Sequence, residues 1–420
     1  MVGFFTENEV PIVKQRKVGK TYGCSSCQRY LYCESPKFEP FGDNEKGIMN
    51  IFSYPTEMQD VKGDMSQNKN VRYVAKYLAS KGIDLARDCT NLFAVACYSS
   101  QKNTPLPAQI EACRDKVFEA IAEYHPKLIL LHGEQAIKSV VGRNWHKDFG
   151  TFRKWTGHTI PDVSLNAWVC PLFLASSKED GEEYVTLWKQ DMDNALSKLC
   201  EVMDYVEPNY TVYMKEEHIV QCLSRIIARS KVEPFQMAFD YETTGLKPHK
   251  TDIHRIVCVS FSFRFNGVQK TYCIKYPESE EGCTLLKRIL RSSRISKIAH
   301  NLIFEEMWSE EIVGCSVTPW GWDTILGAHL LDSRDNTKSL KFQTYVNFGV
   351  AGYDDEVSPY LKGVDNKDSN SLNRLLEYIK NVRNYKKVME YCAMDSLYTL
   401  ALAEKQQSLF GGSVDDDFYV

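Results

Sequence analysis

Segments typical of helices and of strands alternate along this chain in two successive series, and this alternation limits the folds open to it. In the first half, the helical pattern "AQIEACRDKVFEAIAEY" (108–124) precedes the strand-like run "KLILLHG" (127–133). The rhythm restarts near residue 207 with "TVYMKEEHIVQCLSRIIARS", and strand-like segments then follow at 235–246, 255–265 and 270–277. This pattern predicts a two-domain α/β protein, whose first domain has a mostly parallel sheet.

The length of 420 residues agrees with more than one domain, since a domain commonly takes about 100 to 200 residues. We expect a first domain at 1–207, a second at 208–410 and an acidic tail at 411–420. The tail could dock on a partner, but a charged, unstructured chain end is the simpler interpretation. The net charge of −4 shows no overall basic character, so binding to nucleic acid would depend on local patches.

The chain opens without a secretory leader pattern and contains no apolar stretch of about 18 residues. We therefore expect a cytoplasmic protein without membrane attachment, located in the host cytoplasm if it is viral. The thiol pool of that compartment keeps cysteines reduced. The 14 cysteines are then candidates for metal binding where they cluster, and for small buried residues where they are scattered.

Two acids follow the apolar strand-like run "PFQMAF". Asp240 and Glu242 lie two positions apart, so on a strand they project from the same face. Their carboxylates would repel each other at that distance unless a cation lay between them. The pair is weak evidence alone, because an acidic chain of this length contains several such pairs by chance.

Two further pairs have helical spacing. Asn301 and Glu305 are four residues apart, as are Tyr391 and Asp395, so each pair shares one face of a predicted helix. Each residue also has an ordinary interpretation. Tyr391 could be a core aromatic, Asp395 a surface charge, and Glu305 the partner of a nearby cation.

Taken together, "FDYETTGL", "AHNLIFE" and the Tyr-x3-Asp of "YCAMD" resemble the motifs of the DEDD superfamily of 3′–5′ exonucleases. The resemblance is to the DEDDy-type proofreading domain of family A DNA polymerases, and it covers most of 208–408. It implies a ribonuclease H-like fold with a mixed sheet. It also implies phosphodiester hydrolysis with two Mg²⁺ or Mn²⁺ ions, which are hard cations that prefer oxygen ligands.

The resemblance assigns roles to individual residues. Asp240 would bind both ions, Glu242 and Asp395 would complete the site that activates water, and the Tyr391 hydroxyl would orient that water. Glu305 would bind the second ion, although the family more often has aspartate at this place.

The resemblance also implies contacts with a single-stranded or frayed 3′ end of DNA. Leu246 would wedge against the terminal base and Thr243 would touch the 3′ end, while Asn301 and Phe304 would support the strand. Asp323 in "WDT" is expected to be a structural partner.

Cysteines in the first half have a spacing that suggests a metal site. "YGCSSC" contains Cys24 and Cys27, and after a long gap Cys97 and Cys113 are separated by fifteen residues. A C-x2-C motif alone could bind zinc, form a redox pair or do neither. The full set resembles the iron–sulfur uracil-DNA glycosylases over about residues 20–178. The resemblance implies a [4Fe–4S] cluster held by the four thiolates, and tetrahedral zinc is the alternative.

This half departs from the glycosylase pattern at both catalytic motifs. Ser53 aligns with the carboxylate that activates water, and Leu174 and Ala175 align with the His-Pro pair. Serine without a partner is not a base at neutral pH, and leucine cannot stabilise a uracil anion. We therefore expect an inactive glycosylase-like domain, unless Glu57, the only nearby acid, restores activity.

The combined prediction is a metal-dependent 3′–5′ DNA exonuclease that proofreads in bacteriophage-type replication. A DNA polymerase subunit or another replication protein is the expected partner. An active uracil-DNA glycosylase with an accessory nuclease domain is one alternative, and a non-enzymatic DNA-binding scaffold is another. The basic, aromatic stretch "GRNWHKDFGTFRKW" (142–155) could contact a DNA backbone or be a loop with two packed tryptophans.

Overall fold

The structure is a computed structural model that describes residues 23–411, except 36, 99–103, 175–180, 204, 250–252 and 366–369. Ala175 and nearly all of the acidic tail therefore lie outside the described residues. The chain divides into two compact units. The first runs to residue 205 and includes 345–351, and the second contains 206–344 and 352–420.

The first unit is built on a five-stranded sheet in the order β2-β1-β3-β5-β4. The first four strands in this order are parallel, and the edge strand β4 is antiparallel to β5. The prediction of a mostly parallel sheet is thus confirmed. The strands are β1 (Ile48–Phe52), β2 (Cys89–Phe93), β3 (Leu128–His132), β4 (Ile160–Asp162) and β5 (Ala167–Leu172).

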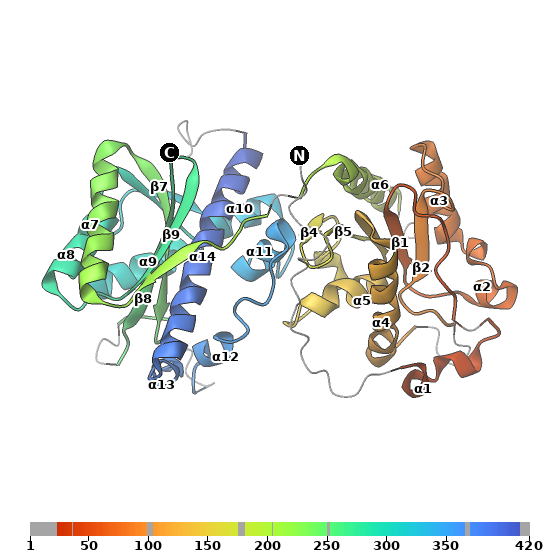
Figure 1. The fold of residues 1–420 in the computed structure, drawn as a ribbon, viewed down its shortest axis with the longest axis horizontal. Helices are drawn as coiled ribbons and strands as arrows, with labels where there is room; N and C mark the ends of the chain where they lie inside the picture. Colours follow the sequence, from red (N-terminus) through yellow and green to blue (C-terminus); the bar gives the residue numbers. More distant parts are fainter. Residues whose placement is uncertain are drawn as a thin grey trace. The chain divides into compact units, whose positions relative to one another are not determined.

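Helices cover both faces of this sheet (Figure 1). Apolar residues of α3 and α6 pack on one face in a single core cluster, and α4 and α5 contact β2, β1 and β3. The α-helices of the unit are α1 (Cys24–Cys27), α2 (Glu57–Lys62), α3 (Lys69–Ser80), α4 (Pro107–Tyr124), α5 (Glu134–Asn144) and α6 (Glu182–Ser197). Short 3₁₀ turns are η1 (Arg29–Tyr32), η2 (Met65–Gln67), η3 (Phe152–Lys154) and η4 (Lys198–Cys200).

The second unit contains a six-stranded mixed sheet in the order β11-β10-β7-β8-β9-β6. Strands β7, β8 and β9 form the antiparallel meander predicted from the sequence, whereas β10 and β11 run parallel to β7 and β6 runs parallel to β9. The strands are β6 (Tyr210–Tyr213), β7 (Phe235–Thr243), β8 (Ile256–Phe265), β9 (Val268–Lys275), β10 (Ile295–Ala299) and β11 (Trp320–Asp323).

The long helix α14 packs on one face of this sheet, and α7 and α8 pack on the other (Figure 1). The helices are α7 (Glu216–Val232), α8 (Glu280–Leu290), α9 (Leu302–Trp308), α10 (Thr324–Leu331), α11 (Leu340–Phe348), α12 (Ser358–Leu361), α13 (Leu375–Tyr378) and α14 (Val382–Leu409). A π-helical turn, η5 (Ser309–Val313), continues α9.

The alternation of side chains along β7 decides where its acids point. Met237, Phe239 and Tyr241 lie in the core cluster with α7 and α8. Because neighbouring residues of a strand project to opposite faces, Asp240 and Glu242 face α14. Among the described residues, no helix is long and apolar enough to span a membrane.

Candidate active site and cysteine pocket

Three elements of the second unit bring four carboxylates together. Asp240 and Glu242 come from β7, Glu305 from α9 and Asp395 from α14. Asp240 is half-buried, and the other three residues are at most 6% exposed. The four acids predicted from sequence motifs therefore lie in one buried cluster, because each influences the ionisation of at least one of the others.

Burial and mutual repulsion shape the ionisation of these acids. The pKa of Asp240 is raised well above its usual range by burial and then by the charges of Asp395, Glu242 and Glu305. Burial and Asp395 raise the pKa of Glu242, and burial followed by neighbouring carboxylates raises that of Glu305. Without a bound cation, the folded protein opposes the charged forms of Asp240, Glu242 and Glu305.

The cluster has features that fit bound divalent ions. The Glu305 Oε2 atom is buried and has no hydrogen-bond partner among the described residues. Carboxylate oxygens of Asp240 and Glu242 lie within 4.8 Å of each other. Hard divalent cations take oxygen ligands at about 2.0–2.6 Å, so one ion could contact both carboxylates.

Lys341 and Tyr353 also reach this cluster, and sequence reasoning missed both. The Lys341 Nζ atom of α11 donates to Asp395 Oδ1, and Tyr353 OH donates to the same oxygen at 2.7 Å. Lys341 also donates to Tyr353 OH at 2.9 Å and lies 4.3 Å from the centre of the Tyr391 ring. One positive side chain therefore partly offsets the negative charge of the acids.

The Tyr391 side chain is 9% exposed and lies on α14 one turn before Asp395. Burial, then Asp395 and Glu242, raises the pKa of its phenol well above 10, so the hydroxyl stays protonated at neutral pH. A protonated phenol beside the carboxylates can donate a hydrogen bond to a bound water or phosphate oxygen.

Asp323 holds the start of two helices. It accepts from the backbone N–H groups of Asn301 and Leu302 at 3.0 and 3.2 Å, and from Ile325 N at 3.0 Å. Asn301 adopts a left-handed conformation with φ of 77°. These bonds place the first turn of α9, and with it Glu305, so Asp323 is the structural partner expected.

The four residues predicted to contact a nucleic-acid strand have different environments. Leu246 is 59% exposed and Asn301 is exposed, so both are accessible to a ligand. Thr243 is buried, and its hydroxyl donates to Gly245 O at 2.7 Å. Phe304 is half-buried and packs against the core near Trp308. Their roles in substrate binding stay predictions.

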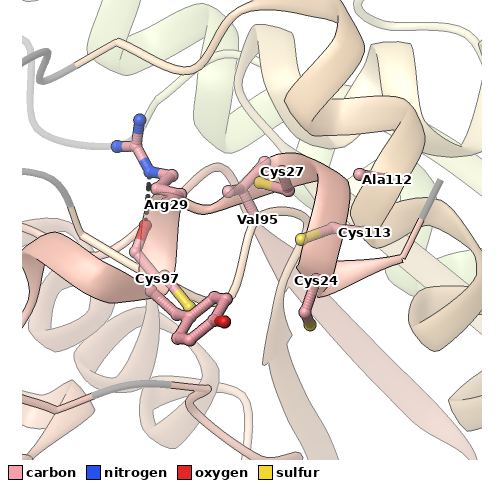
Figure 2. Close-up of a pocket in the computed structure, with 8 residues that line it drawn as sticks. Cys24, Cys27, Arg29, Val95, Cys97, Ala112 and Cys113 are labelled. Atoms are coloured by element: carbon pink, nitrogen blue, oxygen red, sulfur yellow. Dashed lines mark hydrogen bonds between the residues drawn. The ribbon is translucent and has the colours of Figure 1, made fainter.

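In the first unit, the four predicted cysteines line a single pocket (Figure 2). Cys24 and Cys27 lie on α1, Cys97 follows β2, and Cys113 lies on α4. Sixty-nine residues separate Cys27 from Cys97 in the sequence, and the fold brings both side chains to the same pocket. Two other cysteines of this unit could replace one of the four as a ligand. Cys33 is half-buried near Cys97, and Cys89 is fully buried on β2.

A buried arginine completes the lining of this pocket. Arg29 is 2% exposed, and its Nε donates to Cys97 O at 2.7 Å (Figure 2). Its Nη1 donates to Gln109 Oε1 at 3.3 Å. Thiolates at the cysteines would raise the pKa of Arg29, which burial lowers. The pocket thus offers four sulfur ligands together with one positive charge.

Ser53, Gly133 and Leu174 follow β1, β3 and β5 at the carboxyl ends of these parallel strands, where such a sheet commonly binds a ligand. The Ser53 hydroxyl donates to His132 O at 3.0 Å. A Cβ atom added to Gly133 would lie 2.7 Å from Ser53 Oγ and 2.9 Å from Leu174 Cγ. Glu57 is exposed at the start of α2.

The two tryptophans of the stretch at 142–155 are packed. Trp155 is fully buried, Trp145 is 8% exposed and Lys154 is 5% exposed. The Lys154 ammonium lies 4.9 Å from the Trp155 ring centre and donates to Asp148 O. The packed tryptophans agree with the interpretation of this stretch as a loop, whereas the basic side chains of Arg143, Lys147 and Arg153 are exposed.

A sequence model of the 3′–5′ exonuclease family matches residues 215–409, a range that contains the four acids and Tyr391. The second half of the chain is thus similar in sequence to the 3′–5′ exonuclease family. The match does not extend into the first unit. No curated protein matches the chain.

Solved structures are similar to about half of the chain. A structure described as the apo form of the nuclease is 20% identical with a TM-score of 0.33, and the match covers 48% of this chain and 82% of the nuclease chain. Escherichia coli RNase D, described as an exoribonuclease involved in structured RNA processing, is 17% identical with a TM-score of 0.32 and covers 48%. Brucella melitensis NrnC bound to pGG is 17% identical with a TM-score of 0.32, covering 50%. The match takes in 44% of the RNase D chain and 99% of the NrnC chain.

Proposed function

We propose that the second unit removes nucleotides from a 3′ end by hydrolysis with two divalent ions, Mg²⁺ or Mn²⁺. One observation carries the proposal: four carboxylates from β7, α9 and α14 meet in one buried cluster within a 3′–5′ exonuclease domain. Two such ions would activate the attacking water and stabilise the leaving 3′ oxygen.

Each of the four acids has its own role in metal binding in this proposal. Asp240 would bind both ions, Glu242 and Asp395 would hold the ion that activates water, and Glu305 would hold the other. The raised pKa values of Asp240, Glu242 and Glu305 support cation binding, since burial and then neighbouring charges raise them and a bound cation would oppose both effects. Glu305 is one methylene longer than aspartate, and the start of α9 is held by Asp323.

Tyr391 makes the enzyme a DEDDy-type exonuclease in this proposal. Its hydroxyl orients the attacking water by donating a hydrogen bond, while Lys341 and Tyr353 hold Asp395 in place. Leu246 and Asn301, both exposed and each four residues from an acid in the sequence, contact the terminal nucleotides together with Thr243 and Phe304.

We infer DNA as the substrate and proofreading in phage-type replication as the role, with a DNA polymerase subunit or another replication protein as partner. The support is the resemblance of the three motifs to the proofreading domain of family A polymerases. A scaffold without activity would have no use for four buried acids, of which Asp240, Glu242 and Glu305 each cost free energy in the folded protein when ionised.

For the first unit we propose a [4Fe–4S] cluster bound by Cys24, Cys27, Cys97 and Cys113. A tetrahedral zinc ion, with Zn–S bonds near 2.3 Å, would need sulfur atoms roughly 3.8 Å apart. No three of these four cysteines, all of them described, have sulfur atoms that lie within 4.8 Å of one another. This wider spacing favours a larger group, and the charge of Arg29 would offset part of the negative charge that four thiolates leave on either metal group.

We further propose that the first unit has no glycosylase activity and serves to position DNA or to bind other replication proteins. Ser53 and Leu174 stand where the glycosylase motifs have their catalytic groups, and Glu57, the residue on which an active glycosylase would depend, is exposed on α2.

The nuclease proposal is tested with labelled single-stranded DNA, mismatched-primer DNA and RNA of the same sequence. We expect Mn²⁺-dependent release of nucleoside monophosphates from the 3′ end, faster from DNA than from RNA, and none from Asp240→Ala. Digestion that persists in EDTA or in this variant would contradict the two-ion mechanism. Equal digestion of RNA would contradict the assignment of DNA.

The cluster proposal is tested by anaerobic purification. A brown protein with about four iron atoms per chain is expected. A colourless protein with one zinc ion per chain would replace the cluster by zinc.

A further inference from the structure

Cys392 lies between the acid cluster and two other buried thiols. Its Sγ atom lies 3.6 Å from Asp240 Oδ2 and 3.3 Å from Ser260 Oγ. The sulfur atoms of Cys258, Cys273 and Cys392 are all within 4.8 Å of one another, and each of these cysteines is fully buried. None of the three thiols has a role in the hydrolysis proposed above.

The same sulfur also forms a group with the two acids of β7. Carboxylate oxygens of Asp240 and Glu242 and the Cys392 Sγ atom lie within 4.8 Å of one another. An ion with bonds of about 2.3 Å to sulfur and 2.0–2.2 Å to oxygen can join such atoms after small side-chain shifts. The Glu305 Oε2 atom, buried and without a hydrogen-bond partner among the described residues, belongs to the same acid cluster.

We propose that Asp240, Glu242 and Cys392 form a binding site for thiophilic divalent cations such as Zn²⁺ and Cd²⁺, and that an ion held there inhibits the exonuclease. The inhibitory part rests on the proposed function, because Asp240 and Glu242 are also the proposed ligands of the catalytic ions. The thiol releases its proton to solvent when the ion binds, since the thiolate is the metal ligand.

Ligand softness explains why such an ion would inhibit. Mg²⁺ and Mn²⁺ prefer oxygen and gain little from a sulfur ligand, whereas Zn²⁺ and Cd²⁺ bind thiolate strongly. A soft ion held by Cys392 therefore competes for the two carboxylates and leaves them unavailable to the catalytic ions.

A site formed by the three thiols alone is the competing arrangement. It would place three thiolates, with no oxygen ligand beside them, in a fully buried region. The mixed site needs one thiolate only, and its other ligands are carboxylates near the positive charge of Lys341. The electrostatic cost thus favours the mixed site.

The binding test titrates the full chain with Cd²⁺ and follows the ultraviolet charge-transfer absorption of Cd–thiolate bonds. Cd²⁺ bound in the pocket of Cys24, Cys27, Cys97 and Cys113 contributes the same absorption in every variant, so differences between variants report on the new site. We expect Cys392→Ser and Asp240→Asn each to weaken one Cd²⁺ equivalent at least about tenfold, and Cys258→Ala to retain it. Loss in Cys258→Ala with retention in Asp240→Asn would establish the three-thiol site instead. Unchanged binding in Cys392→Ser would overturn the proposal.

The second measurement is inhibition of hydrolysis by Zn²⁺ at fixed Mn²⁺, relative to the uninhibited rate of each variant. The Zn²⁺ concentration that halves the rate should rise at least about tenfold in Cys392→Ser. It should not change in Cys283→Ser, which alters a half-buried cysteine on α8. Equal inhibition of Cys392→Ser and the unmodified protein would overturn the inference alone. A protein that binds Cd²⁺ but shows no Mn²⁺-dependent hydrolysis would overturn the proposed function while leaving the metal site standing.

Discussion

Three buried carboxylates in the second unit have a free-energy cost of ionisation that a bound cation would reduce. Burial and like charges raise the pKa values of Asp240, Glu242 and Glu305, so each ionised acid costs free energy in the metal-free fold. Lys341 offsets part of this cost through its contact with Asp395. Stability and metal binding are therefore linked at these residues.

We expect Asp240→Asn to raise the melting temperature of the metal-free protein, because the change removes one repelling charge. For a unit of this size, each kcal/mol corresponds to roughly 2–4 °C. The variant should also lose the stabilisation that Mn²⁺ gives to the unmodified protein. Thermal unfolding with EDTA and with Mn²⁺ measures both effects. Asp335→Asn, a change at an exposed acid, is the control, and a lower metal-free melting temperature for Asp240→Asn would contradict the repulsion.

Tyr391→Phe should slow hydrolysis by about ten- to a thousand-fold while leaving Mn²⁺ binding intact, because the ring remains and only the hydroxyl is lost. Single-turnover rates and calorimetric Mn²⁺ titration separate the two effects. Weaker Mn²⁺ binding with an unchanged rate at saturating Mn²⁺ would show that the hydroxyl acts on the metal site and not on the water.

A histidine in the first unit predicts a pH dependence. Burial lowers the pKa of His132 to about 3, and the ring stacks on Phe52 with Nε2 at 3.0 Å from Asn50 Oδ1. The unfolded chain has a histidine pKa near 6.5, so between about pH 6.5 and 3 it binds a proton that the folded protein does not. Stability therefore falls as the pH decreases through this range, by up to about 1.4 kcal/mol per pH unit.

The corresponding experiment is urea unfolding of the first unit within the full chain at pH 7, 6 and 5. His132→Gln should remove this part of the pH dependence, and His146→Gln, at an exposed histidine, should not. An identical pH profile for His132→Gln and the unmodified protein would mean that His132 is protonated in the fold.

At the scale of elements, strong periodicity made β3, β7 and the meander strands predictable. The spacing of residues on one face of each predicted element identified the four acids, which lie on β7, α9 and α14. Lys341 and Tyr353 carried no comparable signal. They are 54 and 42 residues from Asp395, and α11 brings Lys341 to it through tertiary packing that no local pattern encodes. For the same reason, the sequence could align Ser53 with a glycosylase carboxylate but could not show that its hydroxyl donates to the backbone carbonyl of His132.

The cysteine pocket joins α1, a helix of four residues, to α4 and to the end of β2. So short a helix is not stable alone, and a metal bound only in the folded state would stabilise it. We expect Cys97→Ser to lower the melting temperature of the first unit by on the order of 10 °C and to abolish its iron content. Cys200→Ser, at an exposed cysteine, is the control. Retention of iron in Cys97→Ser would assign the fourth ligand to Cys33.

At the scale of the whole molecule, the two units differ in what their sites can do. The second gathers four carboxylates in a buried cluster, and the first gathers four cysteines and Arg29 around one pocket. The two units therefore carry different kinds of candidate metal ligand, oxygen in the second and sulfur in the first.

We expect the full chain to leave uracil in DNA. Glycosidic cleavage needs a group that steers water and a donor to the leaving base, which together contribute several powers of ten in rate. The assay uses uracil-containing duplex DNA and Asp240→Ala, which silences the nuclease, and it measures abasic sites. Their formation would show that Glu57 or another group performs this chemistry, and Glu57→Gln would then identify it.

The length of α14 has a consequence for the order in which the second unit loses structure. The helix has 28 residues, about 42 Å, and Asp395 lies near its middle, 13 residues after Val382 and 14 before Leu409. Helices fray from their ends, and most residues of α14 from Tyr391 to Ala403 are buried. In hydrogen exchange, the amides around Asp395 should therefore be among the slowest in the protein, so partial opening at either end of the helix leaves the carboxylate of its central turn in place.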